Sequence, residues 1–200
     1  MKIVVLADED AFETIQRSND EAEWIKAAQV NAFTEHADAA AFFDLTEEAV
    51  LNDHPFTGKP LFVNSVAYPL TAGKNIIRIN AWKGFLENTT WEVSGIIGEE
   101  ALAVLSYLNK KIIECPDEPG FISARIIAMI INEAYYAKGE EVSSEADIDT
   151  AMKLGTNYPY GPFEWAQKIG IQNIYTLLKK LSLRDPRYQP SPLLTKLSLQ

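Results

Sequence analysis

Cysteine and histidine are scarce in this 200-residue sequence, and their scarcity excludes two kinds of stabilising site. A single cysteine, Cys115, excludes an internal disulfide and suits a reducing cytoplasm, which is the localisation that we expect. His36 and His54 are the two histidines, too few with one cysteine for a Cys/His zinc site. We therefore predict no bound metal.

Long apolar runs are also missing. Lysine, glutamate or asparagine interrupts every apolar stretch well before the roughly eighteen residues that a transmembrane helix needs. The opening MKIVVLADEDAF reaches three acidic residues too soon for the core of a signal peptide. The sequence predicts a globular chain that does not enter a membrane.

Positive charge is scarce in the first third of the chain. Residues 1–60 contain thirteen acidic and four basic residues, a net charge of −9, while the whole chain carries −10. Acidic surfaces repel both nucleic acid and anionic membranes, so we expect neither as a partner. The simplest interpretation of these acids is a solvated face that keeps the protein soluble.

Glycine does not occur before Gly58, and this absence bears on cofactor binding. In nucleotide-binding α/β folds, the first strand leads into a glycine-rich turn whose backbone amides closely approach a pyrophosphate. Here the apolar run at 2–7 leads into Asp8, Glu9 and Asp10, whose carboxylates stand where the phosphate charges would lie. We therefore expect no cofactor, and NAD in particular is not expected to bind in the usual way.

The first 116 residues alternate between apolar runs and amphipathic stretches, which predicts a small α/β domain with a mainly parallel sheet. The expected strands are 2–7, 40–45, 60–66, 75–82, 89–95 and 111–116. The expected helices are a short one over 10–16, one over 46–53 that Thr46 caps, and an amphipathic one over 98–111.

From residue 117 onward the apolar period is helical, so residues 117–200 are predicted to form an all-α domain. The expected helices are 121–138, 143–155, 161–170, 171–183 and 191–198, with Gly155 and Gly170 as helix stops. The first of these is apolar on nearly every side. We expect its own domain to cover one side, and a partner subunit or the sheet domain to cover the other.

Several motifs follow one another in this second half. DEPGFISAR at 117–125 is followed by NEA at 132–134, DIDTAM at 147–152, PYGPFE at 159–164 and DPRYQPSPLL at 185–194. In order and spacing, these motifs resemble the C-terminal domain of the 3-hydroxyacyl-CoA dehydrogenases, and the resemblance covers about residues 60–194. It implies a truncated, degenerate Rossmann-like domain over 1–116 and, over 117–200, a helical domain of the 6-phosphogluconate/3-hydroxyacyl-CoA dehydrogenase type.

The match weakens in the first domain, where VNSVAYPLT at 63–71, INAW at 79–82 and WEV at 91–93 resemble the family's catalytic segments. The family's histidine and the carboxylate that orients it are twelve positions apart, as are Asn80 and Glu92, so the register agrees.

Residue by residue, the resemblance places the family's active-site serine at Val66 and its general-base histidine at Asn80. It places the orienting carboxylate at Glu92 and the asparagine of the docking helix at Ala124. Glu92 is thus the one catalytic position that keeps its chemistry. Oxidation of a 3-hydroxyl needs a base that titrates near the working pH, and an asparagine amide cannot serve. The residues expected to contact substrate or line a groove are Asn64, Ser65, Asn80, Phe121 and Ala124.

Three functions remain open. The first is a catalytically impaired relative, a pseudoenzyme, that binds an acyl-CoA-like or other small ligand, or acts as a partner in a complex. The second is an active NAD-dependent 3-hydroxyacyl-CoA oxidoreductase with atypical cofactor binding and Glu92 as its base. The third is a structural protein that serves only for assembly. The resemblance also implies a homodimer formed through the helical domain.

Simpler interpretations compete with these roles. Glu92 is equally well explained as a surface carboxylate on a strand. Asp147 and Asp149 fit first-turn helix charges, His54 fits an ordinary surface loop, and Cys115 fits a small buried hydrophobic residue.

Overall fold

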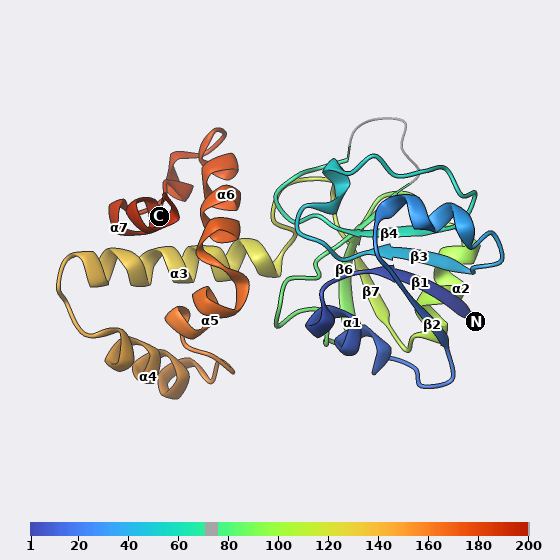
Figure 1. Ribbon diagram of the computed structural model, residues 1–200. Helices are drawn as coiled ribbons and strands as arrows, with labels where there is room; N and C mark the ends of the chain where they lie inside the picture. Colours follow the sequence, from blue (N-terminus) through green and yellow to red (C-terminus); the bar gives the residue numbers. More distant parts are fainter. Residues whose placement is uncertain (71–75, 200) are drawn as a thin grey trace. The chain divides into compact units, whose positions relative to one another are not determined.

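The computed structural model describes residues 1–70 and 76–199, which divide into two compact units, Met1–Phe121 and Ile122–Gln200 (Figure 1). The expected boundary followed residue 116, and the compact units divide five residues later. Thr71 of the motif at 63–71 and the first position of the strand expected over 75–82 lie outside the described residues.

The first unit contains a sheet of seven strands among the described residues, in the order β2-β1-β3-β4-β5-β6-β7. Its strands are β1 (Lys2–Leu6), β2 (Glu23–Ala27), β3 (Ala41–Asp44), β4 (Leu61–Asn64), β5 (Ile77–Ile79), β6 (Thr90–Ser94) and β7 (Lys111–Glu114). Neighbouring strands are parallel except at β5–β6, which are antiparallel. The predicted mainly parallel α/β fold is confirmed.

The first unit has fewer α-helices than the sequence predicted, and the one expected over 98–111 is shorter. Its helical segments are α1 (Glu9–Gln16), α2 (Glu99–Tyr107) and the 3₁₀ segments η1 (Val30–Glu35) and η2 (Ala49–Leu51). The helix expected over 46–53 is wrong, because only the single turn η2 forms there. Glu48 precedes this turn in a left-handed conformation and turns its carboxylate to Ser65 and Ala67, so it does not extend a helix.

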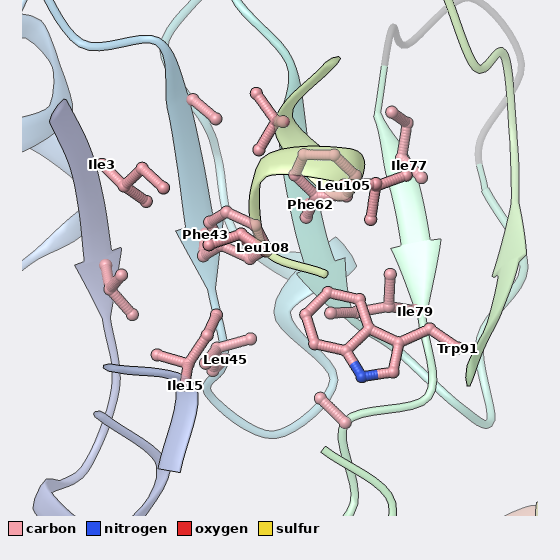
Figure 2. Packing of buried hydrophobic residues seen from close by; sticks show 14 of the residues in the cluster. Ile3, Ile15, Phe43, Leu45, Phe62, Ile77, Ile79, Trp91, Leu105 and Leu108 are labelled. Carbon is pink, nitrogen blue, oxygen red and sulfur yellow. The ribbon is translucent and has the colours of Figure 1, made fainter. Parts of the chain in front are cut away.

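Both faces of the sheet are buried, which explains the continuous apolar runs of its central strands. On one face, Ile3 and Phe43 pack with side chains from α1 and α2, including Ile15 and Leu105 (Figure 2). On the other face, a second cluster is covered by residues of η1 and η2, with Phe33 against Phe42. The 3₁₀ segments η1 and η2 therefore cover this face of the sheet, as α1 and α2 cover the other.

The second unit is all-helical, as predicted. Its elements are α3 (Ser123–Gly139), α4 (Glu145–Thr156), α5 (Pro162–Ile169), α6 (Ile171–Ser182), η3 (Pro186–Tyr188) and α7 (Pro192–Ser198). Helix α3 contacts α5, α6 and α7 (Figure 1). Within α3, the buried amide of Asn132 donates to Gln189 O (2.9 Å) and accepts from Ser191 N (2.8 Å), which fixes the proline-rich connector before α7.

Candidate functional site

The carboxyl ends of β1, β3, β4 and β5 lie at the same edge of the sheet because these strands are parallel. Ligands of open α/β sheets bind outside this edge, near the point where the strand order reverses. Here the reversal falls at β1, whose neighbours are β2 and β3. The sheet thus positions most of the predicted site residues of the first unit at the end where such folds carry their chemistry.

Asn80 and Glu92 face each other across β5 and β6. The backbone N–H of Asn80 donates to Glu92 O (3.3 Å), and its side-chain Nδ2 donates to Glu92 Oε2 (3.4 Å). Asn80 Oδ1 also accepts from Trp82 N (3.4 Å). The arrangement resembles a carboxylate that accepts a hydrogen bond from a histidine ring N–H, but here the side-chain amide of Asn80 takes the place of the imidazole. The Asn80 amide can donate and accept hydrogen bonds, but it cannot act as a general base as an imidazole does.

Asn64, Ser65 and Val66 leave β4 beside this pair. Asn64 Oδ1 accepts from Ala81 N (3.1 Å), and Ser65 Oγ lies 2.9 Å from both Glu48 Oε2 and Tyr68 O. The Val66 side chain is fully buried in the apolar interior. The structure therefore gives Asn64 and Ser65 local hydrogen-bonding roles.

A buried arginine holds the turn after β4 and the segment that ends the first unit. Arg78 is fully buried and donates from Nε to Ser65 O (2.9 Å), from Nη2 to Val66 O (3.2 Å) and from Nη1 to Asp117. Its guanidinium carbon lies 4.7 Å from the centre of the Phe121 ring. The sequence analysis missed Arg78; its place in an apolar strand, NIIRI, was the available signal.

Two further predicted site residues, Phe121 and Ala124, follow the Pro-Gly turn. Phe121 has a left-handed backbone (φ 47°) and a buried ring, and the preceding Gly120 N–H donates to Val66 O (2.8 Å). Ala124 is a fully buried position of α3 in the second unit. Its methyl group supplies no hydrogen bond to a ligand.

Acidic side chains surround the amino terminus of α1. Asp8 is the N-cap residue, and its Oδ1 accepts from Ala11 N (2.8 Å). Lys83 Nζ lies 3.1 Å from Asp10 Oδ2 and 3.6 Å from Asp8 Oδ2. The hydrogen bond to Asp10 is the main cause that raises the pKa of Lys83. The protein's own carboxylate thus occupies one of the helix-start amides, the kind of group that binds a pyrophosphate in nucleotide-binding folds.

A second polar cluster lies where β3 ends, and the sequence analysis missed it. Asp44 is fully buried, and its carboxylate accepts from Thr46 Oγ1 (2.5 Å), Asn52 Nδ2 (2.6 Å) and His54 Nε2 (2.9 Å). Burial alone disfavours the charged carboxylate, but these hydrogen bonds outweigh it and lower the pKa of Asp44.

The expectation that His54 is an ordinary surface residue is wrong. Its side chain is 3% exposed, and Nδ1 is buried without a hydrogen-bond partner. The loop between Asp44 and His54 brings the two together, and no periodic pattern in the sequence signals a loop of this kind. The cluster fixes the segment that contains η2.

Across residues 1–70 and 76–199, no group of three or more His, Cys, Asp or Glu side chains is placed to hold a metal ion. Every helix in that same part of the chain is too short or too polar to cross a bilayer. Cys115 is half-buried, and burial raises the pKa of its thiol.

Comparison with known proteins finds similarity in the helical unit. The family model for the 3-hydroxyacyl-CoA dehydrogenase C-terminal domain matches residues 120–200. The 3-hydroxyadipyl-CoA dehydrogenase of Escherichia coli K12 is 44% identical over 102 residues, which are 50% of this chain and 22% of that protein. A probable 3-hydroxybutyryl-CoA dehydrogenase of Bacillus subtilis is 38% identical over 99 residues, 48% of this chain and 34% of that protein.

Solved structures are similar to this chain as well. The 3-hydroxybutyryl-CoA dehydrogenase of E. coli is 35% identical, with a TM-score of 0.55, over 62% of this chain and 27% of that one. FadB2 of Mycobacterium tuberculosis has a TM-score of 0.74 over 98% of this chain and 92% of its own, at 15% identity, which establishes the likeness of fold. The chain thus has the fold of these dehydrogenases along nearly its whole length, and its helical unit is similar in sequence to their C-terminal domain.

Proposed function

We propose that this chain is a 3-hydroxyacyl-CoA dehydrogenase-like protein that does not turn over a hydroxyacyl substrate with NAD, and that acts by binding an acyl-CoA-like ligand as a dimer. The hydrogen bond from Asn80 to Glu92 is the observation that carries this proposal. The carboxylate that would orient a catalytic histidine is present, but an amide stands where the imidazole would accept the proton.

Two more features support the loss of turnover. Val66 and Ala124, at the positions that the resemblance gives to a serine and an asparagine, are fully buried and have no polar side-chain atom. At the start of α1, Asp8 caps the helix and Asp10 adds a second carboxylate, so a pyrophosphate there would meet negative charge in place of free amides.

The direct test is a fluorescence titration of the full chain with NADH and an assay of acetoacetyl-CoA reduction. We expect no saturable NADH binding and no turnover above the buffer rate. Turnover that disappears in Glu92→Gln would contradict the proposal and would assign Glu92 as the base of an active oxidoreductase.

Ligand binding and assembly need separate measurements. Isothermal titration with acetoacetyl-CoA, compared with coenzyme A alone, is expected to show binding that depends on the acyl group. Light scattering at micromolar concentration is expected to give twice the mass of one chain. A monomer would remove the dimer from the proposal, and absence of acyl-CoA binding would leave a structural role as the better account.

A further inference from the structure

The helical unit contains a pocket whose residues are not among the predicted site residues. It lies where α4, α5 and the loop between them meet, and the two helices contact each other (Figure 1). Its volume is about 540 Å³, which is in the range of pockets that hold small molecules. All of its lining residues belong to the second unit. They are Lys153, Pro159, Tyr160, Glu164, Gln167 and Lys168.

Aromatic contacts hold one wall of the pocket in place. The centre of the Tyr160 ring lies 4.9 Å from that of Trp165, with the two rings nearly perpendicular. Trp165 is a buried residue of α5, so Tyr160 packs on a fixed support. The Nζ of Lys168 lies 4.6 Å from the centre of the Tyr160 ring. The wall therefore combines an apolar ring surface with a lysine ammonium held beside it.

Three charged side chains line the pocket, and two of them neutralise each other. Lys153 Nζ donates to Glu164 Oε1 (2.5 Å), and Glu164 Oε2 accepts from Gly161 N (2.9 Å). The hydrogen bond from Lys153 lowers the pKa of Glu164, so this carboxylate is ionised at neutral pH. Within residues 1–70 and 76–199, Lys168 has no carboxylate partner. The lining therefore carries one net positive charge, at Lys168.

This lining does not suit a phosphate. Phosphate sites commonly use free amides at a helix start or the fork of an arginine. The amides of Phe163 and Glu164 at the start of α5 already donate to Asp149, and no arginine lines the pocket. A phosphate dianion would also leave excess negative charge beside Glu164.

A carboxylate matches the groups that remain. It carries a single negative charge, and its two oxygens can accept from the Lys168 ammonium and from the exposed side-chain amide of Gln167. Pro159 and the Tyr160 ring give apolar surface on which a short carbon chain can pack.

We propose that this pocket binds a small organic carboxylate, with its charged end at Lys168 and Gln167 and its carbon chain against Tyr160 and Pro159. The carboxylate is either a free acid or the far end of an acyl chain carried by coenzyme A. Only this second source rests on the proposed function.

The test is an NMR titration of the ¹⁵N-labelled full chain with hexanoate, followed at the side-chain amide of Gln167. We expect saturable shifts with a dissociation constant on the order of 1 mM, a typical value for a ligand of this size. Hexanamide has the same carbon chain and no charge, so it should bind roughly tenfold more weakly. No saturation with hexanoate, equal binding of hexanamide, or tighter binding of hexyl phosphate would overturn the proposal.

Three variants assign the charge. Lys168→Gln should weaken hexanoate binding roughly tenfold and leave hexanamide binding unchanged, while Lys168→Arg should keep hexanoate binding within about threefold. Lys179→Gln is the matched control, because it removes the same charge from an exposed position on α6, outside the pocket. An equal loss in Lys168→Gln and Lys179→Gln would show attraction to the net charge of the unit in place of a site.

Coenzyme A thioesters separate the two sources of the carboxylate. Glutaryl-CoA ends in a carboxylate, and butyryl-CoA ends in a methyl group. Shifts of the Gln167 amide with glutaryl-CoA and not with butyryl-CoA would support an acyl-CoA as the source. Binding of hexanoate but of neither thioester would contradict the acyl-CoA ligand of the proposed function and would leave the carboxylate site supported, with a free acid as its ligand.

Discussion

At the scale of single residues, Arg78 is a charge buried inside the sheet unit. It is fully buried, and it satisfies the carbonyls of Ser65 and Val66 and the carboxylate of Asp117. Asp117 is exposed, but removal of the guanidinium leaves the carbonyl oxygens of Ser65 and Val66 without their buried donors, which is destabilising. Arg78 therefore joins three separate pieces of chain at the edge of the sheet that carries the candidate site.

We predict that Arg78→Met lowers the free energy of unfolding by about 3 kcal/mol, measured by urea denaturation. Arg17→Met is the matched control, because Arg17 pairs with Glu13 on an exposed helix face, where the change should cost less than about 0.5 kcal/mol. A loss at Arg78 no larger than at Arg17 would show that the buried network does not stabilise the fold.

Glu48 gives a pH dependence of definite sign. Burial raises the pKa of Glu48 above its ordinary 4.5, although hydrogen bonds from Ala67 and Ser65 oppose the shift. The folded protein therefore binds this proton more tightly than the unfolded chain, and the free energy of unfolding falls as the pH rises from about 4.5 through the raised pKa.

Glu48→Gln removes this titration and keeps the shape of the side chain. The free energy of unfolding of the variant, relative to the parent, should therefore increase as the pH rises through that window. Urea denaturation between pH 4.5 and 7.5 measures the difference. Glu21→Gln, at an exposed position, is the matched control. A flat difference for Glu48→Gln would refute the buried, raised pKa.

At the scale of elements, a carboxylate on α4 caps α5. Asp149 is buried, and its oxygens accept from the first-turn amides Phe163 N (2.8 Å) and Glu164 N (3.2 Å). We expected Asp149 to be a first-turn charge of its own helix. This expectation is wrong, because its carboxylate caps the next helix, α5. Gly161 makes the approach possible, since a Cβ at this position would overlap the Asp149 side chain.

We predict that Gly161→Ala destabilises the helical unit by about 2 kcal/mol, because the methyl group displaces the capping carboxylate. Gly155→Ala provides the contrast. Nothing lies within 4 Å of a Cβ at Gly155, so this change inside α4 should be neutral or stabilise by up to about 1 kcal/mol. Thermal unfolding followed by circular dichroism measures both, and a Gly161→Ala variant as stable as the parent would contradict the cap.

Elements with a strong periodic or apolar signal could be predicted, and those held by specific contacts could not. The runs at β1, β3 and β4 are buried on both faces, so their composition alone indicates strands. Strand β2, EWIKA, was missed because it lies at the edge of the sheet and is largely open to solvent, which leaves it little apolar signal. Helix α4 continues past the expected stop at Gly155 and ends at Thr156, where Asn157 adopts the left-handed capping conformation.

The candidate site likewise contains one contact that could be predicted from the sequence and others that could not. The pairing of Asn80 with Glu92 was open to prediction because the two lie on adjoining strands at a recognisable spacing. The clusters around Asp44 and Arg78 depend on loops whose paths no pattern specifies. Contacts of this kind become visible only when the chain is folded.

At the scale of the whole molecule, the two units differ sharply in charge. Residues 1–121 contain twenty acidic and nine basic residues, and residues 122–200 contain eight acidic and nine basic residues. The first unit therefore carries −11 and the second +1, so the repulsion of polyanions that the sequence predicted belongs to the sheet unit. A dinucleotide would have to bind against this charge as well as against the cap at Asp8.

The proposed loss of the base and the proposed loss of the phosphate site would each abolish turnover, so they need separate tests. The triple variant Val66→Ser, Asn80→His, Ala124→Asn restores the three side chains that the resemblance calls for and leaves the start of α1 unchanged. We predict that it still fails to oxidise NADH with acetoacetyl-CoA, followed by absorbance, because Asp8 and Asp10 still oppose the pyrophosphate.

The single variant Asn80→His supplies the control for geometry. Its imidazole should form the hydrogen bond to Glu92 that the amide now makes, and the neighbouring carboxylate should raise the imidazole pKa above about 6.5, measurable by NMR titration. If that pairing forms and the triple variant remains inactive, the missing phosphate site is sufficient to prevent turnover. NADH oxidation by the triple variant would show instead that the nucleotide site survives and that the base alone was lost.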